Sequence, residues 1–238
     1  MGHTRLATRG TQQTAISFLR STSLTTLVQE EIVRMILSGE LDAGAQVKEF
    51  AIADRLGVGR SSVREAFRAL EEAGLVRLEK NRGVFVREIG DEEAGEMYEV
   101  RAGLDELAGR LLAPRITTAQ LDELRCRVEE LESSLSPETF GAYFTLNLKF
   151  HDRIVEMAGN RKLLTMYRRL INEMHLLRSR GLLRGGGLLV SNDEHKIIVA
   201  ALAERDPAAT AIAMRDHVLS GRDRMLAATD AVTPRPAA

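Results

Sequence analysis

The chain has 238 residues and an almost balanced charge, with 33 Lys and Arg against 34 Asp and Glu. This length predicts two domains of ordinary size, and a hydrophobic content of 44% is enough to give each a core. A single cysteine excludes an internal disulfide framework. The sequence has no apolar run long enough for a membrane span and no apolar leader, so we expect a cytoplasmic protein with no membrane partner.

Residues 1–24 are rich in Thr, Ser and Gln, and they carry three arginines but no acidic residue. This composition predicts a flexible tail. Such a tail could be a basic arm close to nucleic acid, or a segment of no fixed role. We expect residues 230–238 to form a second flexible tail.

Residues 25–88 carry the most informative pattern, which predicts two short helices, a glycine turn between them, and a hairpin. The second helix has an apolar stripe at helical spacing, formed by Val63, Phe67 and Leu70. Ser62 and Glu65 have the spacing of a capping box, which places the start of this helix at Ser61 or Ser62. The arrangement is typical of a winged helix-turn-helix, which places one helix in the major groove of DNA.

The start of the second helix and the hairpin turn supply the candidate DNA contacts. Residues at the start of a recognition helix meet base edges, and arginine can bind guanine through two hydrogen bonds. Two β-runs, Leu75–Leu78 and Val84–Val86, flank a basic turn and predict the wing. The predicted DNA-binding residues are Arg60, Ser61, Ser62, Arg64, Arg82 and Gly83. The alternative is a small helical subdomain whose arginines are only solvated.

Residues 91–229 show helical periodicity almost throughout and predict an antiparallel bundle of about six helices. We expect helices over residues 92–114, 118–134, 136–159, 161–183, 189–204 and 207–228. The predicted fold class is therefore mainly α, with a winged helix-turn-helix followed by an all-α bundle. Residues 1–88 have a small excess of basic residues and the remainder a small excess of acidic residues, which suits a localised nucleic-acid footprint.

Four of the five histidines lie in the predicted bundle. His151, His195 and His217 come from three different predicted helices, and Asn147 lies one helical turn before His151. Three imidazoles and one side-chain oxygen could close on a divalent cation, and this mixed donor set leaves the identity of the metal open. Alternatively, these histidines are polar residues at helix ends with no common ligand.

The N-terminal segment resembles the DNA-binding domain of the GntR family of bacterial transcription regulators. The resemblance rests on Gly59–Phe67, Glu72–Val76 and Asn81–Gly83, which follow the turn, recognition helix and wing of that family. Two positions depart from the family pattern. Gly59 replaces the usual Ser or Thr, and Phe50 replaces an arginine that touches DNA in several members.

The predicted bundle resembles the FCD effector domain of the FadR branch of that family. Three motifs carry the resemblance: Asn147–His151, Asn192–His195 and Met214–His217. It implies a divalent metal ion (Zn, Ni or Mn) held by Asn147, His151, His195 and His217. It also implies a small carboxylate effector, bound by the metal and by Arg101. Arg101 could instead form a salt bridge with Glu99, Asp105 or Asp152.

These patterns together predict a ligand-responsive bacterial transcription regulator, which we expect to be a repressor and not an enzyme. A homodimer would bind a palindromic operator, since the symmetry of the protein is matched by that of the site. A small organic acid at the metal site would release the homodimer from the operator or modulate its binding. One alternative is a metal-free regulator of the same fold that senses a larger ligand, such as an acyl thioester. The other is a metal-dependent hydrolytic enzyme, against which the absence of an HExxH motif argues.

Overall fold

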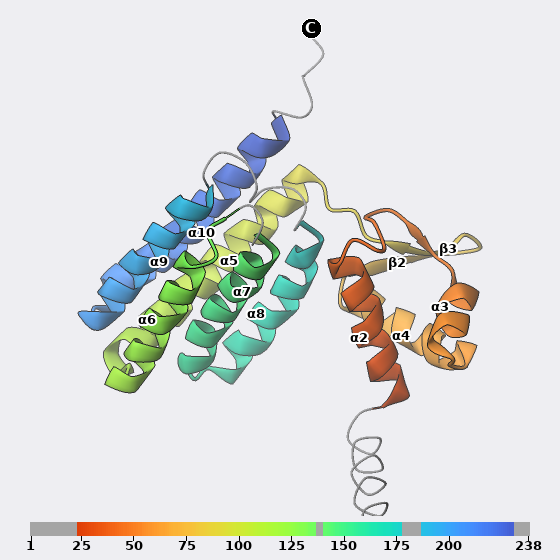
Figure 1. The fold of residues 1–238 in the computed structure, drawn as a ribbon, viewed down its shortest axis with the longest axis horizontal. Coiled ribbons are helices and arrows are strands. Elements are labelled where there is room, and N and C mark those ends of the chain that lie inside the picture. The colour runs from red at the N-terminus through yellow and green to blue at the C-terminus, as the bar shows by residue number, and fades with distance from the viewer. Residues whose placement is uncertain (1–22, 137–139, 178–186, 231–238) are drawn as a thin grey trace, which may run out of the picture. The chain divides into compact units, whose positions relative to one another are not determined.

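In the computed structural model, residues 23–136, 140–177 and 187–230 are described, and they form two compact units that divide after Glu88 (Figure 1). The first unit combines three short helices with a small sheet, and the second is a helical bundle. The predicted fold class is confirmed. The predicted tails lie outside the described residues, except where the first described helix begins at Leu24 and the last ends at Asp230.

The N-terminal unit packs its helices against a three-stranded antiparallel sheet of order β1-β3-β2. Its elements are α2 (Leu24–Leu37), β1 (Gln46–Val47), α3 (Glu49–Leu56), α4 (Arg60–Glu72), β2 (Val76–Glu79) and β3 (Gly83–Val86). The predicted stripe of α4 is buried, and Ile32 of α2 and Val86 of β3 are fully buried in the same unit. The predicted wing is the β2–β3 hairpin. Strand β1 was not predicted, because two residues show no periodicity.

Helix α4 begins earlier than the sequence suggested, and the predicted capping box is wrong. Gly59 is the N-cap, with an extended backbone and no side-chain hydrogen bond to the helix. Glu65 instead accepts a hydrogen bond from Thr25 of α2, at 3.0 Å. Gly57 ends α3 in the left-handed region, at φ 64°, so the chain turns sharply and enters α4 at Arg60. The turn therefore sets the start of the helix, and no side-chain cap takes part.

The C-terminal unit is built from long helices, among which α5 and α10 run side by side (Figure 1). Its helices are α5 (Asp91–Leu112), α6 (Thr118–Glu132), α7 (Phe140–Met157), α8 (Arg161–Met174), α9 (Gly187–Ala203) and α10 (Pro207–Asp230). Gly109 permits the close approach of α5 and α10, because a Cβ atom there would lie 3.0 Å from Met214 Cγ and 3.1 Å from the Thr210 carbonyl oxygen. The closeness of this pair positions the residues of α10 that face the core.

Several predicted helix boundaries in the bundle differ from the structure by one or two residues, and the end of the fourth helix differs by more. The helix expected to run to residue 183 ends at Met174, and a 3-10 turn follows over His175–Leu177. Residues 178–186, which include the end of that predicted helix, lie outside the described part of the chain. Gly187 is the first residue of α9, two residues before the predicted start of that helix. The difference arises because the spacing of apolar residues does not fix the residue at which a helix begins.

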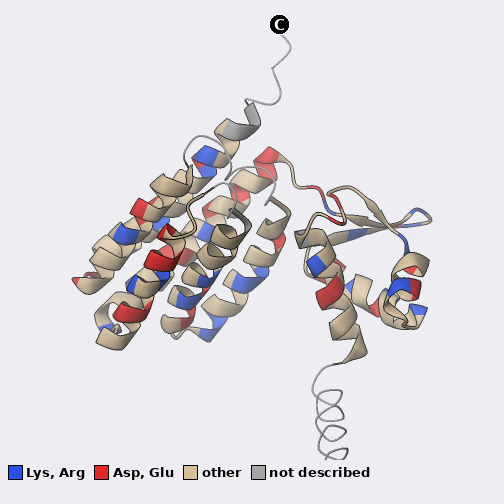
Figure 2. Cartoon of the chain, in the orientation of Figure 1, with Lys and Arg blue, Asp and Glu red and all other residues tan. Residues whose placement is uncertain are grey.

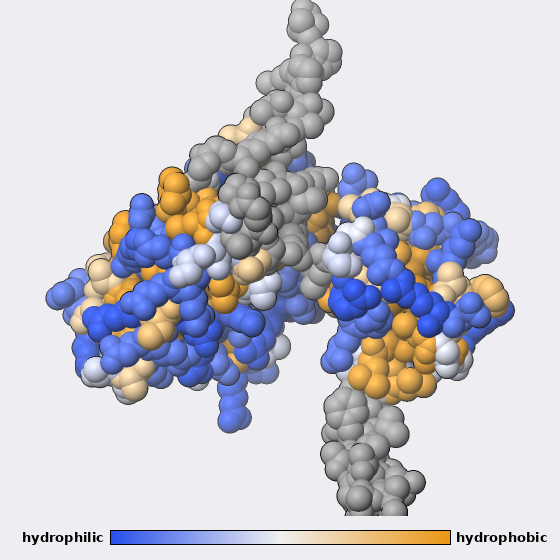
Figure 3. Space-filling view, viewed as in Figure 1, coloured by the Kyte–Doolittle hydropathy of each residue, from blue (hydrophilic) through white to orange (hydrophobic). Residues whose placement is uncertain are grey.

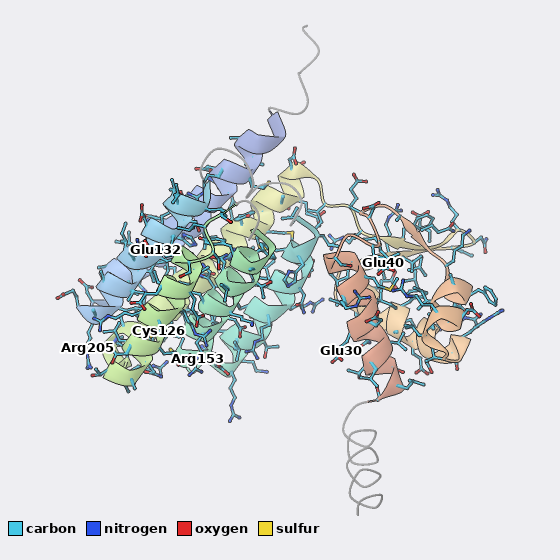
Figure 4. All side chains as sticks on the ribbon, viewed as in Figure 1. Glu30, Glu40, Cys126, Glu132, Arg153 and Arg205 are labelled. Carbon is cyan, nitrogen blue, oxygen red and sulfur yellow. The ribbon has the colours of Figure 1, made fainter. Side chains whose placement is uncertain are left out.

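The surface of both units is mainly hydrophilic on the visible face, and hydrophobic areas interrupt it (Figure 3). Cys126 is exposed on α6 (Figure 4). On the same helix, Glu132 Oε1 forms an ion pair of 2.9 Å with Lys196 Nζ and so links α6 to α9.

None of the helices in the described ranges combines the length and hydropathy that a membrane span requires.

Candidate functional site

Three histidines converge in the core of the bundle. His151 of α7, His195 of α9 and His217 of α10 are all buried. The Nε2 atom of His151 lies 3.0 Å from that of His217 and 3.3 Å from that of His195. One nitrogen from each ring lies within 4.8 Å of the others. The structure thus brings together the three histidines that the sequence placed on separate helices.

Carboxylates behind two of these rings bias which nitrogen carries the proton. His217 Nδ1 donates a hydrogen bond of 2.7 Å to Glu194 Oε2. Asp105 Oδ1 lies 3.3 Å from His151 Nδ1, too poorly aligned for a good hydrogen bond but close enough to favour a proton on that nitrogen. Both Nε2 atoms then present lone pairs to each other. A cation between them would turn this repulsion into coordination.

Asn147 adds an oxygen donor on the same face of α7. Its side chain is buried, and its Oδ1 atom has no hydrogen-bond partner among the described residues. A buried carbonyl oxygen without a partner costs about 1–3 kcal/mol. Three neutral nitrogens and this unsatisfied oxygen form a donor set that fits a divalent transition metal.

Burial keeps the three imidazoles neutral near pH 7. It lowers the pKa of His151 to about 4 and lowers the pKa values of His195 and His217 as well. Burial acts because a charged ring loses its hydration in the core, and the nearby guanidinium of Arg101 lowers all three pKa values further. Only the neutral ring can bind a metal. The cluster is therefore in the protonation state that metal binding requires.

Glu194 anchors His217 through a network that the sequence alone did not reveal. Burial would raise the pKa of Glu194, but hydrogen bonds from His217, Arg224 and Ser220 lower it to about 2. Arg224 donates to both carboxylate oxygens, at 2.9 and 3.0 Å, and Ser220 Oγ donates at 2.6 Å. His217, Ser220 and Arg224 share one face of α10, at spacings of three and four residues. This spacing was the available signal for the network.

A cavity opens beside the cluster, and its space including the open mouth is about 820 Å³. Its polar lining comprises Arg101, Asn147, His175, Ser191, His217 and Arg224. Its apolar lining comprises Tyr98, Phe144, Leu148, Ile171, Met174, Leu177, Val218 and Met225. A cavity with a few polar groups at one side and an apolar remainder is typical of a small-molecule site.

Arg101 lies between the cavity and Asp105. Its side chain lines the cavity and is almost fully buried on α5. Its Nε atom also lies 3.5 Å from Asp105 Oδ2, so among the three acids considered from sequence, Asp105 is the salt-bridge partner. Asp105 therefore stands next to both Arg101 and His151. The sequence signal was its position four residues after Arg101.

The candidate DNA contacts lie on the N-terminal unit, at the start of α4 and in the hairpin turn. Arg60, Ser61 and Arg64 are exposed, and Ser62 is half-buried. Arg64 Nε forms an ion pair of 2.7 Å with Glu49 Oε2 of α3. The guanidinium of Arg60 lies over the ring of Phe50, 5.1 Å from its centre. Two arginines of α4 are thus held by neighbouring residues of α3.

The wing carries the other two candidates. Lys and Arg residues mark the turn of the β2–β3 hairpin (Figure 2). The side chain of Arg82 is 71% exposed, and its Nη1 atom lies 2.5 Å from Glu79 Oε2. Gly83 has a φ of 109°, which side chains other than glycine rarely adopt, and a Cβ atom there would lie 3.1 Å from Gln46 Nε2. A basic side chain and a glycine whose backbone conformation other residues rarely adopt therefore lie next to each other at the tip.

The two units match two family models. Residues 24–86 match the model of bacterial regulatory proteins of the gntR family, and residues 96–220 match the FCD domain. A "Probable D-xylose utilization operon transcriptional repressor" of Paenarthrobacter nicotinovorans is 30% identical over 209 residues, which span 84% of this chain and 88% of that protein.

Two further relatives agree with these matches. An uncharacterized HTH-type transcriptional regulator, YdhC of Bacillus subtilis, is 29% identical over 149 residues, or 62% of this chain and 66% of that protein. A solved structure of a GntR transcriptional regulator from Rhodococcus sp. RHA1 superposes with a TM-score of 0.72 at 26% identity. It covers 87% of this chain and 99% of that one.

Proposed function

Because the chain belongs to the GntR family of bacterial regulatory proteins and carries an FCD domain, we propose that it is a cytoplasmic repressor controlled by a small organic acid. The family and its relatives are transcription regulators, some of them named repressors, and not enzymes. In this proposal a homodimer binds a palindromic operator. The acid binds beside the histidine cluster, and it releases the homodimer from the operator or modulates its affinity for the operator.

The observation that carries the effector proposal is the convergence of three buried histidine nitrogens beside a cavity that is lined by His217, Asn147 and Arg101. A divalent ion held by His151, His195 and His217, with Asn147 as a fourth ligand, offers open coordination positions to a carboxylate. Arg101 supplies a fixed positive charge and paired N–H donors for the same group. The apolar side chains of the cavity then contact the hydrocarbon part of the acid, and they exclude water from it.

For DNA binding, we assign the start of α4 to the major groove and the hairpin to the backbone and minor groove. Arg60, Ser61, Ser62 and Arg64 supply the contacts of α4, and Arg82 with Gly83 supplies those of the wing. The exposure of the α4 arginines and the exposed Arg82 support this assignment. Residues at the start of such a helix meet base edges, whereas wing residues add contacts to the backbone.

For the homodimer, we propose an apolar face on α5. Val100 and Leu107 are 56% and 40% exposed and lie seven residues apart, so they share one face of α5. Pairing of two such faces would bury these side chains and would give the assembly the two-fold symmetry of a palindromic site.

The proposal is tested on protein purified without chelator and without metal-affinity resin. Elemental analysis should find one divalent ion per chain, and a thermal-shift screen of carboxylic acids should find one that stabilises the metal-loaded protein. Binding to a duplex selected from a randomised library should then respond to that acid. If the protein holds no metal and takes up none on titration with Zn, Ni or Mn, the histidines form a structural cluster and the effector proposal fails.

A further inference from the structure

Phe50, in the first turn of α3, is the most exposed large hydrophobic side chain in the described residues, at 63%. Single exposed apolar residues are common on protein surfaces and need no function. Phe50 differs because its ring has a partner. The guanidinium carbon of Arg60 lies 5.1 Å from the ring centre, within the distance at which an aromatic face attracts a cation.

The two arginines near the start of α4 are held in different ways. Arg64 donates from Nε to Glu49 at 2.7 Å, so a carboxylate neutralises part of its charge and occupies one of its donors. Within the described residues, no carboxylate pairs with Arg60. The ring of Phe50 is uncharged and accepts no N–H bond in the guanidinium plane. Arg60 therefore keeps its full charge and its donors while its orientation is restrained.

We propose that Phe50 is a positioning residue that determines DNA specificity, because its ring holds Arg60 in an orientation suited to reading a guanine edge. This inference rests on the proposed role of α4 as the recognition helix. A guanidinium reads guanine through two donors in its plane, which point at O6 and N7. The contact with the ring restrains the guanidinium without using its donors, so less side-chain freedom is lost on binding. Arg60 then carries base discrimination, whereas Arg64, one of whose donors is occupied by Glu49, adds a contact that does not depend on base sequence.

The experiment compares four variants of the full-length chain. Phe50→Leu removes the ring but keeps an apolar side chain, and Phe50→Tyr keeps the ring. Arg60→Ala and Arg64→Ala remove each guanidinium. Since the operator is unidentified, the probe is a duplex library with a randomised centre, from which the wild type and each variant select their preferred sequences. Affinities are then measured on the duplex that the wild type selects and on a duplex of random sequence and equal length.

We expect Phe50→Tyr to select the wild-type motif. Phe50→Leu and Arg60→Ala should lose base preference at the same position. Phe50→Leu should bind the selected duplex about two- to five-fold more weakly, the effect of an exposed cation–π contact. Phe50→Leu should bind random DNA with the affinity of the wild type. The double variant Phe50→Leu, Arg60→Ala should bind the selected duplex with the affinity of Arg60→Ala alone. Arg64→Ala should weaken binding to both duplexes by similar factors.

A Phe50→Leu variant with the wild-type motif and affinity would overturn the proposal. So would a change of preference at a position that Arg60→Ala leaves intact, since the ring would then contact DNA by itself. If the wild-type chain selects no motif, the proposed DNA recognition fails, and this inference fails with it. That result is distinguishable from a wild type that selects a motif which Phe50→Leu leaves unchanged. Because the ring is exposed, thermal unfolding of Phe50→Leu should match that of the wild type, which separates positioning from folding.

Discussion

At the scale of single residues, the histidine cluster depends on side chains that hold each ring in place. Glu194 fixes the proton of His217, and Asp105 stands behind His151. Groups of this kind orient metal-binding rings and raise their basicity. The unsatisfied Oδ1 of Asn147 marks the side of the cluster where a further ligand belongs. Each of these residues acts through the position of a donor atom, so small substitutions can test them.

Replacing His151, His195 or His217 with Ala should abolish stoichiometric metal binding, because two imidazoles and a neutral amide form a weak donor set. Asn147→Asp should retain or tighten binding, because a carboxylate adds a negative charge next to the cation. His175→Ala is the control, since His175 lines the cavity outside the cluster. Elemental analysis and calorimetric titration measure the outcome. Equal metal content in the cluster variants and the control would contradict the assignment.

The metal-free protein should lose stability as the pH falls below 6.5. Burial lowers the pKa of His151 to about 4 in the folded state, so the unfolded chain takes up the proton first. The free energy of unfolding therefore declines between pH 6.5 and about 4. Between pH 7 and pH 5, His151 alone should lower it by roughly 2 kcal/mol. Denaturant unfolding at both pH values tests this, and His151→Gln should reduce the difference because it removes the titrating ring.

At the scale of elements, the contact between α5 and α10 positions the site. Arg101 and Asp105 belong to α5, and His217 and Arg224 belong to α10. The close approach at Gly109 brings the two helices near enough for Arg101, His217 and Arg224 to line one cavity. The carboxylate of Glu194 then links α9 to α10 through His217, Ser220 and Arg224. The geometry of the site is therefore sensitive to the spacing of these helices.

Gly109→Ala should lower the free energy of unfolding by roughly 1–3 kcal/mol. The new Cβ atom would lie closer to the Thr210 carbonyl oxygen and to Met214 Cγ than van der Waals contact allows. Metal affinity should fall as well, since Met214 precedes His217 by one turn. Gly95→Ala on the same helix is the matched control. A Cβ atom there meets nothing within 4 Å, so stability should rise by about 0.5–1 kcal/mol. Equal changes in the two variants would show that the approach of α5 and α10 tolerates a methyl group.

At the scale of the whole molecule, the proposed function requires that acid binding in the bundle and DNA binding by α4 influence each other. Such coupling is a free energy that acts equally in both directions. Each unit has its own core, so a variant that disrupts the metal cluster should leave α4 and the wing folded. Loss of the response can then be separated from loss of DNA binding.

The effector acid should change the affinity for the selected duplex by about 5- to 150-fold, which corresponds to a coupling of roughly 1–3 kcal/mol. By reciprocity, the duplex should change the affinity for the acid by the same factor. His217→Ala should bind the duplex without acid nearly as the wild type does, but it should not respond to the acid. Fluorescence anisotropy titrations with and without acid measure both quantities. A full response in His217→Ala would separate the effector from the histidine cluster.

Sequence patterns alone predicted the features that depend on neighbours a few residues apart. The stripe of Val63, Phe67 and Leu70 predicted α4, because helical spacing places apolar residues on one face. The β-runs around the basic turn predicted the wing, and the periodicity of residues 91–229 predicted the bundle. The three histidines could be named as candidates because each lies in a short motif, although spacing alone could not bring them together.

Features that depend on contacts between distant segments became visible in the folded chain and not in its sequence. The Ser62–Glu65 pattern suggested a cap, but the turn at Gly57 and the contact of Glu65 with Thr25 start α4 earlier. Local spacing could pair Arg101 with Asp105, but it could not place Asp105 against His151, since these two residues come from α5 and α7. No local pattern could predict the cavity or the contact of the Phe50 ring with Arg60 either. Each requires helices to pack at a particular distance and angle, and packing is a property of the folded chain as a whole.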